Sequence, residues 1–441
     1  MSTRSSVPVP RPIKLAQGSS PQPHTILSTL HFTLALLALL IKLPFYLVWH
    51  FILFRHHSPL TRVAGRHPLA ETIYHIAKCI FNDFPLPASR AVFATQLFLR
   101  RDKWIERVTA PEGVDGVWIR PPRAGKEPDD LVLFWIHGGA FNHDIIGSNM
   151  LFYKSLARNV NDHSGSPRAF SIFVLDYHLA PETIYPSQLI EVQAGYRYLT
   201  RTLGIPSDKI CIGGDSAGGN LVVSFLLHLV EPNVRLEAVS PALERPASVL
   251  LMSPWLSLLP LASRPSRSSQ THSGLDFLTT PSVTLGAYQY LGVEVPFRAG
   301  PSWNPLRWFG LVRDEMPKLE DENGAANEKF DDMYVSPGPE TVQNWDLYGK
   351  ALPHDGKTCV VWGGMEIFAD DVEAFVRALK SVEVNPVELF SPVKCHDWPL
   401  FDFTFPLLAR TKSGGESNKY DFGVQRLGEF LREVSVSKRQ A

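Results

Sequence analysis

The chain has 441 residues and a formal net charge of −1, which gives no bulk field favouring nucleic acid, and we expect no nucleic-acid partner. Its 44% apolar content is that of a globular protein with a large core, and one large α/β domain with insertions accounts for the length. The four cysteines are far apart, which excludes a disulfide-stapled scaffold and leaves a single disulfide open.

The N-terminal part of the chain divides into two segments. Residues 1–24 are rich in Ser and Pro and carry only basic charges, so we predict a disordered basic tail. Residues 25–54 form an almost continuous apolar run, interrupted by Lys42 and Pro44. The run is long enough for a membrane-spanning helix if Lys42 snorkels, and a hairpin centred on the proline is the alternative. A cleaved signal peptide or a mitochondrial presequence fits less well. We therefore expect a membrane anchor of undetermined orientation.

The next segments alternate between helix-like and strand-like patterns. Residues 88–109 place apolar side chains on or near one helical face, which predicts an amphipathic helix. From residue 114 onward, helical patterns at 187–203 and 220–230 lie between continuous apolar runs. These runs occupy residues 131–136, 171–175, 210–212, 248–252 and 358–362. The alternation predicts a doubly wound, mostly parallel sheet with active-site loops at the carboxyl ends of its strands.

A glycine pair follows the first of these apolar runs, in His137-Gly138-Gly139-Ala140-Phe141. Ester hydrolysis builds negative charge on the former carbonyl oxygen, which needs preorganised hydrogen-bond donors. The amides of Gly138 and Gly139 are candidates for this oxyanion hole, with the amide of Ala217 as the third donor. A tight turn after a strand explains most Gly-Gly pairs, so the interpretation depends on a nucleophile further along the chain.

That nucleophile is predicted at Ser216, in the sequence Gly214-Asp215-Ser216-Ala217-Gly218. This G-x-S-x-G pattern stands between an apolar strand and an apolar helix, which is the context of a nucleophile elbow. The turn is so sharp that side chains flanking the serine would clash, and the serine is forced into a strained conformation.

The partners of the serine must follow in the order acid, then histidine. His396 lies in a late loop, after the apolar segment 386–390, and is the predicted base. Glu366 comes directly after the strand at 358–362 and can orient an imidazole, so we predict it as the acid. Asp370 and Asp371 open the next helix, where carboxylates commonly cap free amides. Asp370 remains the alternative acid.

These motifs together resemble the hormone-sensitive-lipase branch of the α/β-hydrolases, close to arylacetamide deacetylases and fungal steryl-acetate deacetylases. The matching stretches are residues 137–141, 176–182, 214–220, 253–255, 366–371 and 396–399. The chain departs from the family pattern at Ala140, where a third glycine is usual. It also departs at Glu366 and Ile367, which replace the first two residues of an Asp-Pro-Leu-x-Asp motif.

The resemblance implies an α/β-hydrolase domain over residues 55–441, with a mostly parallel eight-stranded sheet and a helical cap. The interval 256–348 is too long for a simple connection, and the cap is expected there and at about 70–110. The resemblance also implies structural roles for residues 176–182 and for Asp215.

The expected function is a serine carboxylic-ester hydrolase without a cofactor or metal. It would remove acetyl or other short acyl groups from hydrophobic small molecules, such as sterol-like or secondary-metabolite esters, through an acyl-enzyme. A longer-chain acylglycerol lipase and a non-catalytic ligand receptor on the same fold are the alternatives. The protein is expected at a membrane, that of the endoplasmic reticulum, with residues 25–54 contacting lipid. Its oligomeric state is left open.

Overall fold

The computed structural model describes most of the chain. It covers residues 26–48, 52, 65, 68–98, 102–122, 129–162, 169–233, 243–258, 266–272, 274–293, 329–411 and 416–436. The predicted N-terminal tail, residues 1–24, lies outside the described residues. So does the segment 294–328 of the predicted cap.

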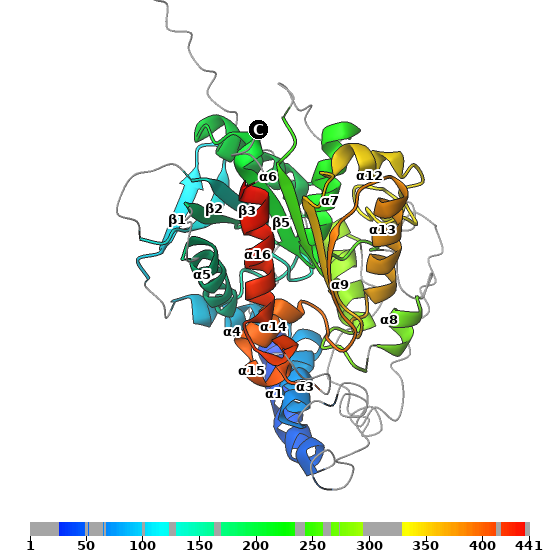
Figure 1. Cartoon of the computed structure of the whole chain (residues 1–441). Coiled ribbons are helices and arrows are strands. Elements are labelled where there is room, and N and C mark those ends of the chain that lie inside the picture. Colours follow the sequence, from blue (N-terminus) through cyan, green and yellow to red (C-terminus); the bar gives the residue numbers. More distant parts are fainter. Residues whose placement is uncertain are drawn as a thin grey trace, which may run out of the picture.

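Within the described part of the chain, eight strands form one sheet in the order β1-β2-β4-β3-β5-β6-β7-β8 (Figure 1). The strand β2 pairs antiparallel with both of its neighbours, β1 and β4, near one edge of the sheet. All neighbouring pairs from β4 to β8 are parallel. The predicted mostly parallel sheet is therefore confirmed. The strands are β1 (Ile105–Ala110), β2 (Val114–Ile119), β3 (Leu131–Ile136), β4 (Phe170–Leu175), β5 (Ile210–Asp215), β6 (Ser248–Met252), β7 (Thr358–Gly363) and β8 (Val387–Ser391).

Both faces of the sheet are covered by helices. On β3, Phe134 and Ile136 belong to one buried cluster, whereas Leu133 and Trp135 belong to the cluster on the other face. Because successive side chains of a strand point to opposite faces, a strand buried on both sides is apolar throughout. This explains the continuous apolar runs in the sequence. Figure 1 shows the resulting three layers.

The helices on the two faces come from different parts of the chain. One face packs against α5 (Gly147–Asn161) and α16 (Phe422–Val436). The other face packs against α6 (Ser187–Arg197), α7 (Ala217–Val230), α12 (Asp346–Ala351) and α13 (Ala369–Ser381). The helix predicted at 187–203 is confirmed, since α6 continues as a π-helical turn over Tyr198–Thr202. Two short helices, α14 (Trp398–Thr404) and α15 (Pro406–Ala409), follow the last strand.

The amphipathic helix predicted over residues 88–109 is only partly correct. The helix α4 (Leu86–Phe98) ends well before residue 109, and Ile105 begins β1. Ile105 pairs with Ile119 in an antiparallel ladder, a partner that a local periodicity cannot reveal. The other described helices in the predicted cap regions are α3 (Pro68–Asp83), α8 (Arg267–Thr271) and α9 (Thr280–Leu291).

An N-terminal helix, α1 (Ile26–Val48), packs against α3. Lys42 is 4% exposed, and its Nζ lies 3.3 Å from Asp83 Oδ2. No helix in the described ranges is long and apolar enough to cross a membrane, so the predicted membrane-spanning segment is not found there. The outer surface of α1 exposes Leu30, Leu34, Leu36, Leu37, Leu40, Ile41, Phe45 and Val48.

All four cysteines lie among the described residues, and each is a buried free thiol. Cys211 and Cys359 are in β5 and β7, where they pack as small apolar side chains. The disulfide that the sequence left open is absent from this structure.

Candidate active site

Ser216 stands at the junction of β5 and α7, with φ 51° and ψ −118°. A positive φ is strained for a residue with a side chain and persists only where the surroundings impose it. Two backbone hydrogen bonds do so here. The Ser216 N–H donates to the carbonyl of Met252 at 2.9 Å, and the Trp255 N–H donates to the carbonyl of Ser216 at 3.0 Å.

The two glycines of the elbow are required by close backbone approach. A Cβ on Gly218 would lie 2.0 Å from the carbonyl oxygen of Ile136. A Cβ on Gly214 would lie 2.6 Å from the carbonyl carbon of Gly218. Neither contact can be relieved by moving a side chain, so the G-x-S-x-G pattern follows directly from the turn.

His396 lies in the loop between β8 and α14 and is 1% exposed. The rings of Phe277 and Phe368 approach the imidazole edge to face, with centroids at 5.8 and 5.3 Å. Burial lowers the pKa of His396 to about 3, because a charged imidazolium is poorly solvated there. The imidazole is therefore neutral at ordinary pH, which is the form a general base requires.

Glu366 is the carboxyl group that the fold brings to the imidazole. Its Oε2 lies 3.8 Å from His396 Nδ1, longer than a hydrogen bond, and such contacts often tighten only when substrate binds. The same oxygen accepts hydrogen bonds from Ser253 Oγ at 2.6 Å and from the Gly363 N–H at 3.4 Å. Burial raises the pKa of Glu366 well above its usual value, and these two donors partly oppose that rise.

Asp370, the alternative acid, is engaged elsewhere. Its Oδ2 accepts the backbone N–H of Ser268 at 2.8 Å, and its own N–H donates to Ser268 Oγ at 3.2 Å. These contacts join the start of α13 to α8. The geometry therefore favours Glu366 as the partner of His396.

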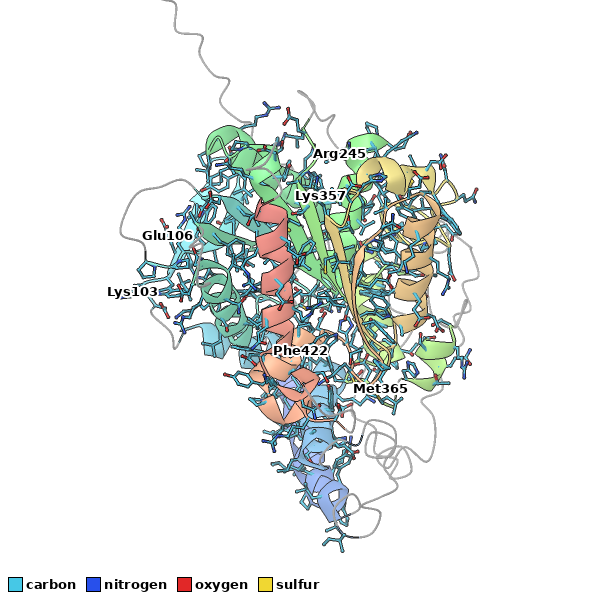
Figure 2. The ribbon with its side chains drawn as sticks, in the orientation of Figure 1. Lys103, Glu106, Arg245, Lys357, Met365 and Phe422 are labelled. Atoms are coloured by element: carbon cyan, nitrogen blue, oxygen red, sulfur yellow. The ribbon has the colours of Figure 1, made fainter. Side chains whose placement is uncertain are left out.

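The loop after β7, which carries Glu366 (the acid loop), and the loop after β8, which carries His396 (the histidine loop), meet at the carboxyl edge of the sheet. Lys357 precedes β7 and Met365 follows it, and Figure 2 shows them at opposite ends of the sheet. The Met365 N–H donates to the carbonyl of Lys394 at 2.9 Å. A Cβ on Gly363 would lie 2.3 Å from that same carbonyl oxygen. The two loops are thus held together by backbone contacts.

The predicted oxyanion loop lies beside Ser216 and lines the same pocket. Gly139 and Ala140 have φ values of 102° and 51°, and the carbonyl of Gly139 accepts the His143 N–H at 2.9 Å. Burial raises the pKa of Asp215 to about 6, and a hydrogen bond from the Gly138 amide is among the contacts that oppose the rise. A Cβ on Gly138 would lie 2.4 Å from Asp215 Oδ2, so this glycine is packed against the elbow. Ala217, the third predicted donor, opens α7.

Ser216 and His396 line one pocket. Its lining combines loops of the sheet with side chains from α3, α4 and the segment leading into α9. The apolar contributors include Phe81, Phe84, Leu86, Trp255, Phe277, Leu278 and Val283. A largely apolar concave site with a few convergent polar groups is typical of a small-molecule site.

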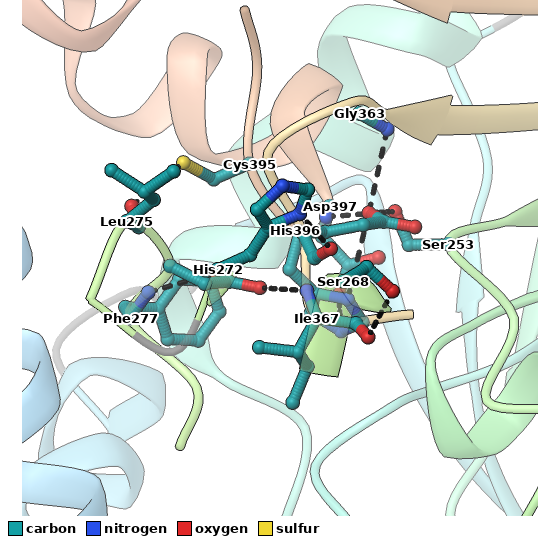
Figure 3. A network of polar contacts seen from close by, with 12 residues as sticks. Ser253, Ser268, His272, Leu275, Phe277, Gly363, Ile367, Cys395, His396 and Asp397 are labelled. Atoms are coloured by element: carbon teal, nitrogen blue, oxygen red, sulfur yellow. Dashed lines mark hydrogen bonds and ion pairs between the residues drawn. The ribbon is translucent and has the colours of Figure 1, made fainter. Parts of the chain in front are cut away.

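Two polar residues at this site were not singled out from the sequence. Ser253 directly follows β6, and besides donating to Glu366 it accepts the Asp397 N–H at 3.0 Å. Asp397 Oδ2 lies 3.2 Å from His396 Nε2. Figure 3 shows Ser253, Gly363, His396 and Asp397 converging. The position of Ser253, immediately after a buried strand, is the same signal that identified Glu366.

Comparisons with known proteins find similar chains. Residues 99–296 match the family model described as steryl acetyl hydrolase. The chain is 31% identical to human hormone-sensitive lipase over 206 residues, which cover 46% of this chain and only 17% of that protein. It is 32% identical to esterase LipU of Mycobacterium tuberculosis over 304 residues, 69% of this chain and 78% of the esterase.

A solved structure of an esterase from the bacterial hormone-sensitive lipase family supports the fold. It superposes with a TM-score of 0.57 at 24% identity, covering 83% of this chain and 98% of the esterase. The α/β-hydrolase fold expected from the sequence is confirmed. The chain belongs to the hormone-sensitive-lipase branch of the α/β-hydrolases.

Proposed function

We propose that the protein is a serine carboxylic-ester hydrolase that removes acetyl or other short acyl groups from hydrophobic small molecules. The observation that carries the proposal is the meeting of a strained Ser216 and a neutral, buried His396 in one apolar pocket. Glu366 behind the imidazole supplies the third member of a triad.

In the first half of the reaction, Ser216 Oγ attacks the ester carbonyl carbon while His396 Nε2 takes the hydroxyl proton. The imidazolium that forms is stabilised by Glu366 on the Nδ1 side. When the tetrahedral intermediate collapses, His396 returns the proton to the alcohol oxygen and the alcohol leaves. In the second half, His396 activates a water that attacks the acyl-Ser216 carbonyl, which releases the acid and restores the serine.

The oxyanion of the tetrahedral intermediate needs donors that are not already used. Since Gly138 is packed against Asp215 of the elbow, we assign the oxyanion contacts to the amides of Gly139, Ala140 and Ala217. Ala140 keeps the amide that a third glycine would supply. Its φ of 51° turns the loop at that point, as a glycine also would.

The choice of a short acyl group and a hydrophobic alcohol is supported by two observations. The pocket lining is predominantly apolar, which suits an ester of a sterol-like or secondary-metabolite alcohol. The matching family model carries the description steryl acetyl hydrolase. Rates on a series from acetyl to oleoyl esters would measure the acyl preference, and faster turnover of the oleoyl ester would favour a lipase.

Replacing Ser216 by Ala tests the hydrolase assignment. We expect kcat/KM for p-nitrophenyl acetate to fall by about 10,000-fold, because the nucleophile is lost, and labelling by a fluorophosphonate probe to vanish. Ser224→Ala is the matched control, since Ser224 is buried in the same helix and donates only to Asn220 Oδ1 at 3.4 Å. Undiminished turnover in Ser216→Ala would sink the proposal.

We also propose that the protein associates with a membrane surface through the outer face of α1. The exposed side chains of this helix are predominantly apolar. Among Asp, Glu, Lys and Arg, the helix contains only Lys42, and this side chain is buried and paired with Asp83. This face is the lipid contact that we propose for the segment. The ring of Phe32 packs against Phe84 at 5.4 Å, and Phe84 lines the pocket. The endoplasmic reticulum stays the predicted location.

A further inference from the structure

Asp397 is a pocket-lining carboxyl group that the proposed reaction steps do not use. In the described part of the chain, the pocket is lined by the carboxyl groups of Asp144, Asp215 and Asp397. Asp144 Oδ1 accepts the Ile145 N–H at 2.6 Å, and Asp215 Oδ1 accepts Trp135 Nε1–H at 2.8 Å. By contrast, Asp397 Oδ1 is buried and has no hydrogen-bond partner among the described residues.

The backbone of Asp397 fixes where this carboxyl group points. Its φ of 49° is a left-handed conformation, and its N–H donates to Ser253 Oγ. The residue is 6% exposed, so water solvates the carboxyl group poorly. Buried polar atoms are normally hydrogen-bonded, so an unpaired one calls for an explanation, and at the wall of a pocket a bound polar group is one that fits.

The groups around Asp397 set its protonation. His396 faces it from its own loop, Asp215 from the elbow, Glu366 from the acid loop and Asp276 from the segment before α9. Burial raises the pKa of Asp397 well above its usual value, and the three neighbouring carboxylates raise it further. A carboxyl group accepts hydrogen bonds in either protonation state and also donates one when protonated, so it suits a hydroxyl group.

The location of Asp397 relative to the reacting atoms defines which part of a substrate it meets. Its Oδ2 lies 3.2 Å from His396 Nε2, the atom that returns the proton to the leaving alcohol oxygen. A hydroxyl group on the carbon next to the ester-bearing carbon can therefore reach Asp397 Oδ2 when the leaving oxygen contacts His396 Nε2. The neighbouring pocket residues Phe277, Leu400 and Phe401 are apolar, so the Asp397 carboxyl group is a local polar group on this part of the pocket wall.

We propose that Asp397 forms a subsite for a hydroxyl group on the alcohol portion of the substrate, so that the enzyme prefers monoacylated vicinal diols to esters of simple alcohols. This inference rests on the proposed hydrolase function. Asp397 binds substrate here and takes no part in the bond changes at Ser216.

Two acetates that differ only by a hydroxyl group in place of a methyl group test the subsite. We expect wild-type kcat/KM for 2-hydroxypropyl acetate to exceed that for isobutyl acetate by about tenfold or more. Asp397→Ala should bring the ratio close to one, whereas Asp397→Asn, which keeps hydrogen-bonding capacity, should retain a preference. Asp144→Asn is the matched control for a pocket-lining carboxyl group and should keep the wild-type ratio.

The outcomes separate the subsite from the hydrolase assignment. If the wild-type protein hydrolyses neither acetate, the proposed function fails. If it hydrolyses both at similar rates, the subsite is wrong and the hydrolase stands, whether or not Asp397→Ala folds. A change in both rates by the same factor in Asp397→Ala would show that Asp397 acts on His396 alone, which also overturns the subsite. Fluorophosphonate labelling of Ser216 shows which variants are folded.

Discussion

At the scale of single residues, the active site depends on a neutral His396 whose acid partner, Glu366, is held close to the imidazole but not yet hydrogen-bonded to it. The imidazole is buried between aromatic rings, and burial lowers its pKa to about 3. Glu366 is held at 3.8 Å by Ser253, which donates to the oxygen nearest the imidazole. The favourable ion pair with Glu366 therefore forms only when His396 takes the serine proton, so its stabilisation is specific to the charged intermediate.

Replacing each candidate acid by its amide, one at a time, identifies the acid of the triad. Glu366→Gln should lower kcat by about 1,000- to 10,000-fold, because the amide cannot stabilise the imidazolium. Asp370→Asn should change kcat by less than about tenfold, since Asp370 is bonded to Ser268. Steady-state kinetics on p-nitrophenyl acetate measures both. The reverse pattern would make Asp370 the acid.

The triad residues could be predicted from the sequence because the fold requires them in a fixed order along the chain. Ser216, Glu366 and His396 occur in the sequence of motifs that the fold requires, and the structure brings them to one edge of the sheet. The contacts of Ser253 and Asp397 were not predictable in this way. They depend on the loops after β6 and β8 meeting, 144 positions apart in the chain.

At the scale of elements, each loop of the site is fixed by backbone contacts at the end of a strand. The sequence located β3 to β7 closely, because burial on both faces gives each of them a continuous apolar run. The edge strand β1 has exposed positions and was mistaken for the end of a helix. Its pairing with β2, not its own side-chain pattern, makes it a strand.

The segment 176–182, expected to be structural, attaches a cap helix to the sheet. Arg90 of α4 donates to both carboxylate oxygens of Glu182, at 2.7 and 3.0 Å, and to the carbonyls of Ala180 and Asn142. A bidentate arginine–carboxylate pair fixes geometry as well as distance. This contact holds α4, whose first residue Leu86 lines the pocket, against the body of the domain.

Gly218→Ala tests the close approach at the elbow. The new Cβ would meet the carbonyl oxygen of Ile136 at 2.0 Å, a backbone contact that cannot yield without moving β3 or α7. We expect the free energy of unfolding to fall by about 3 kcal/mol or more. Gly274→Ala is the control, because nothing lies within 4 Å of its Cβ position. Urea unfolding of both variants measures the difference, and equal midpoints would contradict the steric argument.

At the scale of the whole molecule, α1 and α3 lie at one end, together with α14 and α15 (Figure 1). The apolar run of the sequence predicts a membrane anchor, and the structure adds a contact of that run that composition cannot reveal. Lys42 pairs with Asp83, which is 41 positions away in the chain. The helix α1 therefore buries one side against α3 and exposes the other.

The exposed side of α1 supports the last prediction, because an uncharged apolar helix face partitions into a membrane interface. The triple variant Leu34→Ser, Leu37→Ser, Ile41→Ser removes three exposed apolar side chains from that face. We expect its partition onto phosphatidylcholine vesicles to fall by about 100-fold or more, given 1.5–3 kcal/mol for each fully buried aliphatic side chain. Vesicle flotation measures the bound fraction, and hydrolysis of p-nitrophenyl acetate reports that the variant is folded.

The matched control for that experiment is Leu203→Ser, because Leu203 is a leucine 41% exposed and far from α1 in the chain. It removes one aliphatic side chain of comparable exposure without touching the helix face. If both proteins float as the wild type does, α1 is not the membrane contact. If only the triple variant is released, α1 is the membrane contact, and Phe84, which lines the pocket, packs on this same helix through Phe32.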